Sequence, residues 1–315
     1  MPAGFLIGVG SGLASALLFY SAARGGVLPG SLLFVLTPLP TLLAGFGWGW
    51  LPAAAGALAG ALAVAFAASV AVAAGYALAL GLPAVLATYL AYLSRPDPQH
   101  PDLREWYPPG RLLAALAIYA GLLPVLLLPL IGGSYEPLGA PLAAFYQRLS
   151  EVAPELGWRG LEKEEIAGLA ALTVRLLPGL LAAYWLAIFT LNCYLAARIV
   201  HASGRLGRDW PDLPMLNAPA GFPLLVAGAL GLACLPGVPS IAGSSFAGGL
   251  LFAHLLAGLA LLHCIARQRA RWILLFVYAG LLIFGPYAAI AITIGGLFEP
   301  VFQLKRRLGA LPPPT

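Results

Sequence analysis

The densest polar group of this chain is the segment Ser203–Asp212, SGRLGRDWPD. Arg205 and Arg208 stand three residues apart, and Trp210 precedes a proline that restricts the backbone before Asp212. Basic residues beside a membrane span usually fix topology or contact anionic headgroups. Fixing the topology requires only the charges and not a backbone restrained by proline. The side chains of Arg205, Arg208, Trp210 and Asp212 are therefore candidates for binding a lipid or a protein partner.

A second polar group is EWYPPGR at 105–111. In one interpretation Glu105 and Arg111 form a polar pair that holds a ligand or partner beside Trp106. In the other the segment is an interfacial turn, in which Trp106 anchors at the headgroups and Arg111 extends toward them. The sequence leaves both interpretations open.

Arg175 and Asn192 lie at the edge and in the body of an apolar segment, with a Pro-Gly pair between them. A polar residue inside a membrane is energetically costly, and by default it indicates function. A single Asn also commonly bonds to a neighbouring helix. Both residues are therefore candidate ligand contacts, with helix packing as the alternative.

The pattern expected of an enzyme or a metal site is missing from the sequence. His254 and His263 stand nine residues apart, near opposite faces of one helix, so they cannot bind one metal ion together. Cys193, Cys234 and Cys264 form no CxxC pair, and there is no Walker A motif. We expect no enzymatic activity, no cofactor and no metal, and we keep His263 as a candidate ligand contact.

Long apolar helices must position these residues. Of 315 residues, 61% are hydrophobic and 9% are charged, with mean hydropathy +0.90. The apolar blocks lack period-2 alternation, so they can cross lipid only as helices. We predict an all-α, polytopic transmembrane bundle of eight or nine spans in a single domain, 1–315. The segments are about 4–22, 28–46, 49–70, 72–93, 111–131, 172–197, 219–236, 247–266 and 272–297.

Three polar connections, at about 94–111, 132–165 and 197–213, and a basic tail at 299–315 separate or follow these segments. In the second connection Leu142, Phe145, Leu149 and Val152 recur at helical spacing. This pattern predicts an amphipathic helix at about 141–155 that lies along the membrane interface.

The distribution of Lys and Arg bears on orientation. If the segment 272–297 crosses the membrane once, nine basic residues lie inside and at least seven lie outside. If Gly285 and Pro286 form a re-entrant turn, the count becomes twelve against four. We expect the N-terminus to lie inside.

Small residues recur four apart at Gly8, Gly12 and Ala16, and at Gly56 and Gly60. Such stripes let two helix backbones approach closely. We interpret them as packing faces within the chain; docking to a partner membrane protein is the alternative.

The net charge of +5 does not indicate nucleic-acid binding, because the basic residues occupy short interhelical loops. The N-terminus lacks a positive segment, so we expect the first apolar stretch to be a retained helix. We expect a multi-pass protein of a bacterial inner membrane that contacts membrane lipids.

The chain resembles the YybS-like family of predicted bacterial membrane proteins, domain of unknown function 2232. The resemblance covers nearly the whole length and rests on GWGW at 47–50, EWYPPGR, LPG at 177–179, Asn192 leading into YLAARIV, SGRL–R–WPDL up to Asp212, and GLALLH at 258–263. Family tails tend to carry an Asp ahead of the basic run, where this chain has Glu299. The architecture is similar, more distantly, to substrate-binding subunits of energy-coupling-factor vitamin transporters. That similarity implies docking of a membrane-protein partner through the stripe at Gly8, Gly12 and Ala16.

These patterns favour a non-enzymatic bundle that binds a small molecule or lipid at mid-membrane as a transport-type subunit, its ligand unidentified. The alternative is a scaffold for envelope or membrane-associated complexes, which the charged Ser203–Asp212 loop would serve. Substitutions at Arg175 and Asn192 test the binding hypothesis through ligand binding. Substitutions in the Ser203–Asp212 loop test the scaffold hypothesis through partner capture.

Overall fold

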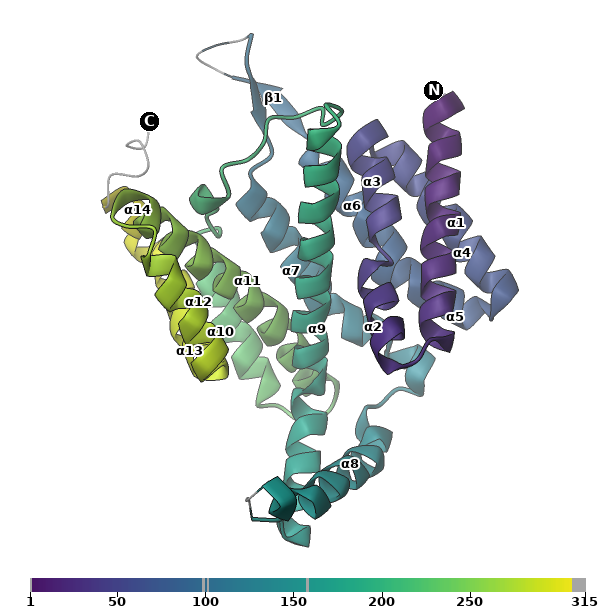
Figure 1. Cartoon of the computed structure of the whole chain (residues 1–315), viewed down its shortest axis with the longest axis vertical. Coiled ribbons are helices and arrows are strands. Elements are labelled where there is room, and N and C mark those ends of the chain that lie inside the picture. The colour runs from purple at the N-terminus through teal and green to yellow at the C-terminus, as the bar shows by residue number, and fades with distance from the viewer. Residues whose placement is uncertain (1, 98–99, 101, 157–158, 308–315) are drawn as a thin grey trace.

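The chain is an all-α, multi-pass membrane bundle. The structure is a computed structural model that describes residues 2–97, 100, 102–156 and 159–307. Parts of two predicted connections and residues 308–315 of the predicted basic tail lie outside the described residues. Within the described chain, seven helical segments are long and apolar enough to cross a membrane (Figure 1).

Four of the seven segments are single helices, and three are interrupted. The single ones are α1 (Pro2–Arg24), α4 (Trp50–Ala67), α9 (Lys163–Ala202) and α11 (Val238–Gln268). The interrupted ones are α2 (Val27–Leu36) with α3 (Leu39–Trp48); α5 (Val70–Tyr76) with the π-helix η1 (Ala77–Gly81) and α6 (Leu82–Ala91); and α7 (Pro109–Leu126) with η2 (Leu128–Ile131).

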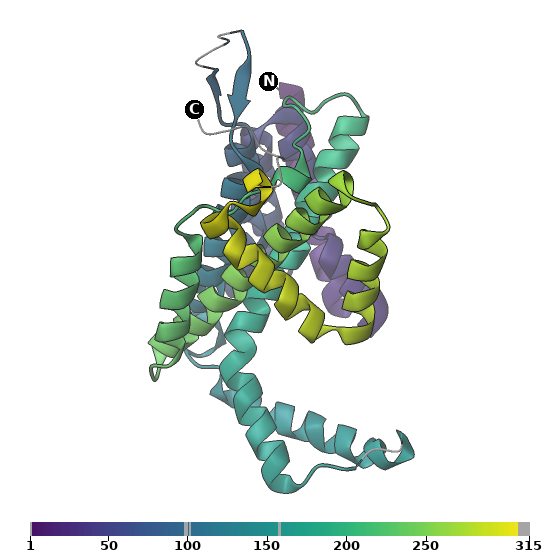
Figure 2. The same ribbon diagram turned by 90° about the vertical axis from the view of Figure 1, so that its left-hand side faces the viewer.

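Two predicted segments form shorter helices. Segment 219–236 contains α10 (Phe222–Ala233), and segment 272–297 is divided into α12 (Ile273–Phe284) and α13 (Pro286–Phe302), followed by α14 (Leu304–Arg307). A 12-residue helix is about 18 Å long, whereas the hydrocarbon layer is about 30 Å thick. The break is at Gly285, whose φ of 47° and ψ of −114° reverse the chain. Figure 2 shows α12 and α13 as a hairpin that returns toward the face it left.

The hairpin brings the described part of the basic tail to the face that carries most of the positive charge. Twelve basic residues lie at this face, which we call the basic face, and Arg24, Arg148, Arg159 and Lys163 lie at the opposite end (Figure 1). The twelve are Arg95, Arg104, Arg111, Arg198, Arg205, Arg208, Arg267, Arg269, Arg271, Lys305, Arg306 and Arg307. The positive-inside rule therefore predicts that the basic face lies on the cytoplasmic side.

The first glycine stripe lies in the interface between α1 and α4. A Cβ atom on Gly8 would overlap the carbonyl group of Pro52, and one on Gly12 would overlap that of Gly56. Gly60 lies against Gly12 and the hydroxyl of Tyr76. Ala16 is buried in the same small cluster as Tyr76. The stripe is covered by the chain's own helices, so it offers no open docking face.

Prolines release backbone carbonyls from the helices, and side chains on other helices bond to them. At the break between α2 and α3, Ser15 donates to the carbonyl of Thr37 at 2.7 Å and accepts a bond from Tyr76 at 2.8 Å. In η1, the amide of Leu82 bonds to Ala77, five residues back, and Pro83 has no N–H to donate.

The carbonyls of Leu78 and Ala79 in η1 are satisfied from two other helices. The Tyr119 hydroxyl of α7 donates to Leu78 at 2.6 Å, and the Trp185 indole of α9 donates to Ala79 at 2.7 Å. The rings of Trp185 and Phe189 stack with centroids 4.8 Å apart. These contacts join the N-terminal helices to α7 and α9.

A short polar end and an amphipathic helix complete the fold. Two antiparallel strands, β1 (Ser94–Pro96) and β2 (Arg104–Trp106), extend from the basic face. At the opposite end, η3 (Glu136–Leu138), α8 (Gly139–Val152) and η4 (Ala153–Leu156) precede α9. The predicted amphipathic helix forms as α8, and its apolar residues Phe145, Leu149 and Val152 are exposed. Tyr146 and Thr173 bond at 2.8 Å and hold α8 against α9.

We predict that Gly12→Ala lowers the free energy of unfolding by about 2 kcal/mol, because the added methyl overpacks the α1–α4 contact. Gly10→Ala is the matched control, since a Cβ on Gly10 meets nothing within 4 Å. Thermal unfolding in detergent measures both. Equal stability of the two variants would contradict the close α1–α4 contact.

Single cysteines, introduced after replacement of the three native ones, test the topology. A membrane-impermeant maleimide added to intact cells should label Glu151→Cys and leave Arg269→Cys and Arg307→Cys unlabelled until permeabilisation. Labelling of Arg269→Cys and Arg307→Cys from opposite sides would refute the hairpin. The reverse pattern for all three would refute the orientation.

Candidate functional site

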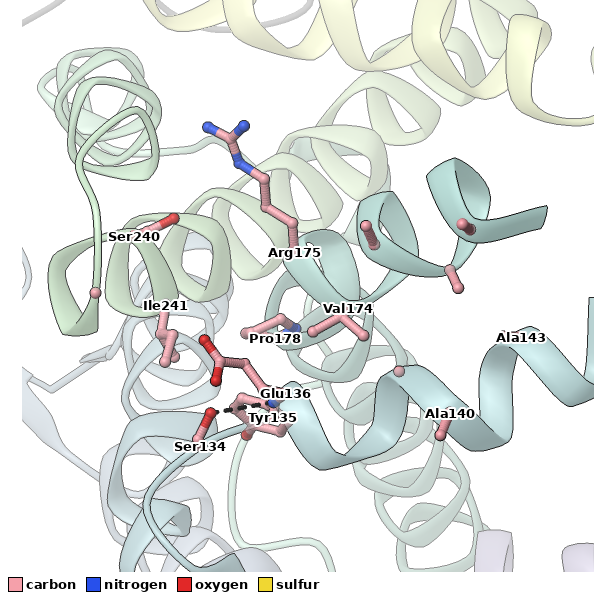
Figure 3. Close-up of a pocket in the computed structure, with 15 residues that line it drawn as sticks. Ser134, Tyr135, Glu136, Ala140, Ala143, Val174, Arg175, Pro178, Ser240 and Ile241 are labelled. Atoms are coloured by element: carbon pink, nitrogen blue, oxygen red, sulfur yellow. Dashed lines mark hydrogen bonds between the residues drawn. The ribbon is translucent and has the colours of Figure 1, made fainter. Parts of the chain in front are cut away.

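A cavity lies where α8, α9 and the beginning of α11 meet, at the end of the bundle opposite the basic face. Its volume is about 670 Å³, and it is open on one side. Ligand pockets typically range from about 300 to 1,000 Å³, so this space is large enough for a small molecule or a lipid headgroup. Figure 3 shows the side chains around it.

Small and apolar residues form most of the cavity wall. Ala140 and Ala143 of α8 face Ala167, Ala170 and Val174 of α9 across this space. The cavity exists because these side chains are small, and larger residues at the same positions would fill the space between the two helices. An apolar wall with a few polar groups is typical of a ligand site.

One cation and one anion lie at the cavity. Glu136 comes from η3 and points inward, whereas the guanidinium of Arg175 lies on the side of Ser240 (Figure 3). The described chain contains no ion pair between Glu136 and Arg175. Both side chains are exposed. Two opposite charges that share a cavity without neutralising each other remain available to a ligand.

Arg175 also has a structural contact. Its Nη2 donates to the carbonyl of Ala233 at 3.2 Å, and the Ser240 hydroxyl donates to the same carbonyl at 3.1 Å. This carbonyl is at the end of α10, where helix carbonyls lack partners. Arginine has five N–H donors, so this one bond leaves most of them for a ligand.

The length of α9 places Arg175 at headgroup depth. Arg175 lies 27 residues before Ala202, which is the end of α9 at the basic face. At 1.5 Å per residue this is about 40 Å, compared with a bilayer of about 40–45 Å including both headgroup layers. The cavity is therefore at the far interface, and the first turns of α9 project beyond it with α8 (Figure 2).

Asn192 lies elsewhere on α9 and is fully buried. Its amide nitrogen donates to Val35 at 2.7 Å, at the break between α2 and α3, and to Ile188 at 2.8 Å. Its Oδ1 atom has no hydrogen-bond partner. The structure therefore gives Asn192 a helix-packing contact and separates it from Arg175.

The remaining candidates lie at the basic face, mainly on residues 203–217, which we call the strap and which includes η5 (Leu213–Met215). Arg208 donates to the carbonyl of Ala91 at 2.8 Å and to that of Tyr107 at 3.4 Å. Burial lowers the pKa of Arg208 below its usual value, although a guanidinium remains charged. Arg205 lies 4.8 Å from the ring centre of Trp48. These contacts hold the strap across the ends of several helices.

The second half of the strap is joined to α11. Arg267 makes two bonds of 2.8 Å to Asp212, and these bonds hold the pKa of that carboxyl below its usual range. Trp210 packs beside Tyr194 and His201. A smaller cavity of about 370 Å³ lies at this point.

The Glu105–Arg111 pair is not formed. Glu105 instead pairs with Arg95 at 2.7 Å, because the antiparallel pairing of β1 and β2 places the two residues opposite each other. The ring of Trp106 contacts that of Tyr92, and Arg111 is exposed. His263 bonds to Tyr278 at 3.2 Å and so joins α11 to α12.

Glu136 and Ser240 join Arg175 at the cavity, although the sequence patterns did not single them out as site residues. In the sequence Glu136 is one of six acids in the connection 132–165, and nothing in its spacing distinguishes it. Its position depends on where η3 lies when α8 packs against α9, which no sequence spacing encodes. Among the described residues, no group of three or more His, Cys, Asp or Glu side chains could hold a metal ion.

We predict that Arg208→Met loosens the strap, because the carbonyls of Ala91 and Tyr107 lose their donor. The expected loss is about 1.5–3 kcal/mol of unfolding free energy, typical of hydrogen bonds to a charged group. Arg269→Met is the control at an exposed position of the same face. Thermal unfolding and limited proteolysis of the strap measure the effect. Equal protease resistance of both variants would show that Arg208 does not fasten it.

Comparisons with known proteins assign no family to the chain. No protein-family model matches the sequence, and no curated protein or solved structure is significantly similar to it.

Proposed function

We propose that this membrane protein is a non-enzymatic binding subunit that holds an amphiphilic small molecule or a lipid in the cavity between α8, α9 and α11. The observation that carries the proposal is the cavity itself. It combines an apolar wall of small residues with two separate charges at headgroup depth. An amphiphile needs such a boundary, because its chain is stable in hydrocarbon and its headgroup is stable in water.

The proposed site is at the interface rather than at mid-membrane. Asn192, a fully buried polar residue of α9, already bonds to Val35 and Ile188. Arg175 is exposed and, within the described chain, makes one hydrogen bond, to the Ala233 carbonyl. A ligand that enters from the lipid would pass beside α8, whose exposed apolar residues favour a position on the membrane surface.

A scaffold role is the alternative, and the strap would serve it. In its favour, the smaller cavity beside Trp210 opens on a face rich in positive charge. Against it, Arg208 already bonds to the carbonyl of Ala91, and Asp212 already bonds to Arg267. We therefore favour the binding role.

We propose further that the chain is a bacterial inner-membrane protein of the YybS-like kind. The distribution of Lys and Arg favours a cytoplasmic position of its basic face. The analogy with energy-coupling-factor subunits has less support, because α4 covers the stripe of α1. A coupling partner would need another surface.

Filling the cavity tests the proposal. Ala167 lines it, whereas Gly168 lies next along the helix with open space around it. Native mass spectrometry of protein extracted gently from its membrane should show a retained small molecule or lipid in wild type and in Gly168→Trp. In Ala167→Trp the retained fraction should fall about tenfold or more, which corresponds to roughly 1.4 kcal/mol.

Arg175→Ala should also release the ligand, whereas Asn192→Ala should retain it. No reproducible ligand in wild type, or equal retention in both Trp variants, would refute binding at this cavity. Stoichiometric protein partners in place of a ligand would favour the scaffold.

A further inference from the structure

We infer that the headgroup bound in the cavity is a zwitterion that carries a primary ammonium and a phosphate, as in an aminophospholipid. This inference rests on the proposed function and identifies the class of ligand. Arg175 would bind the phosphate and Glu136 would bind the ammonium, with the headgroup beside the alanine wall and the apolar chains in the adjacent lipid.

The separation of the two charges carries this inference. Glu136 belongs to η3 and Arg175 to α9, and they line the same cavity without an ion pair between them. A guanidinium binds phosphate through paired N–H donors. A carboxylate accepts bonds from the N–H groups of an ammonium, which a quaternary amine lacks. A ligand with both charges satisfies both sides at once.

The charge of the surrounding surface disfavours anionic lipids. Six carboxylates lie between residues 136 and 165, and the same region carries three basic residues. Arg159 already bonds to Glu165 at 2.7 Å. A net negative surface repels an anionic headgroup, and Arg175 repels a cationic one. A zwitterion with no net charge avoids both penalties.

The size of the site agrees with a lipid headgroup. Ala140, Ala143, Ala167 and Ala170 line the cavity and leave a volume of about 670 Å³ beside the two charges. Ser134 and Ser240 flank the polar end (Figure 3). The Ser134 hydroxyl can donate to a phosphate or ester oxygen, whereas the Ser240 hydroxyl already donates to the Ala233 carbonyl. Ser134 already accepts a bond from the Glu136 amide at 3.1 Å, which holds Glu136 beside the cavity.

Nanodiscs that contain equal parts of phosphatidylethanolamine, phosphatidylcholine and phosphatidylglycerol provide the test. Native mass spectrometry would count the lipids that remain on the released protein. Wild type should retain phosphatidylethanolamine over each of the others by about tenfold, the scale of one charge-assisted hydrogen bond. Glu136→Gln should abolish the preference over phosphatidylcholine while lipid is still retained. Arg175→Gln should reduce retention of phosphatidylethanolamine and of phosphatidylcholine.

Glu151→Gln is the matched control, because Glu151 is an exposed acid of α8 and does not line the cavity. It should keep the wild-type preference. Equal retention of the three lipids by wild type, or an unchanged preference in Glu136→Gln, would overturn the zwitterion inference while lipid binding itself survived. Retention of no lipid or other amphiphile would instead overturn the proposed function. Competition by soluble phosphoethanolamine would assign the site to the free zwitterion, and its failure to compete would assign the site to the lipid.

Discussion

The structure depends on one constraint, which is that a carbonyl freed inside a membrane must find a donor within the protein. Prolines interrupt α2–α3 and α5–α6, so this constraint applies at two breaks. Ser15, Asn192, Tyr119 and Trp185 supply the donors, and they come from α1, α7 and α9. The same bonds therefore satisfy the broken helices and join the first six helices to the rest of the bundle.

Close packing of glycine and serine completes the framework that holds the cavity. Gly179 of α9 approaches the backbones of Ser244 and Gly248 on α11, and Ser245 bonds to Gly121 of α7 at 2.7 Å. These contacts fix α9 against α7 and α11 directly above the cavity. Below them, α9 extends beyond the bundle with only α8 at its side. The cavity lies at this change from close packing to a single pair of helices.

Much of the fold could be predicted from the sequence, because the apolar length and helical periodicity of each segment are local properties. The same is true of α8, whose apolar spacing indicated an amphipathic helix. The partners of polar side chains could not be predicted, because they depend on which helices meet. Glu105 pairs with Arg95 only because β1 and β2 pair antiparallel, and Glu136 reaches the cavity only because η3 and α9 line the same space. The partner of Asn192 could likewise not be predicted, because Val35 lies 157 residues away in sequence.

The reversal at Gly285 also affects how the protein inserts into a membrane. A helix that crosses the bilayer moves the following residues to the other side, whereas α12 and α13 enter and return as a pair. The C-terminal hairpin is therefore topologically neutral: its addition or loss leaves the sidedness of every preceding loop unchanged. Insertion of α1 to α11 fixes the orientation of the protein, and the hairpin can then join α11 through His263 and Tyr278 without altering it.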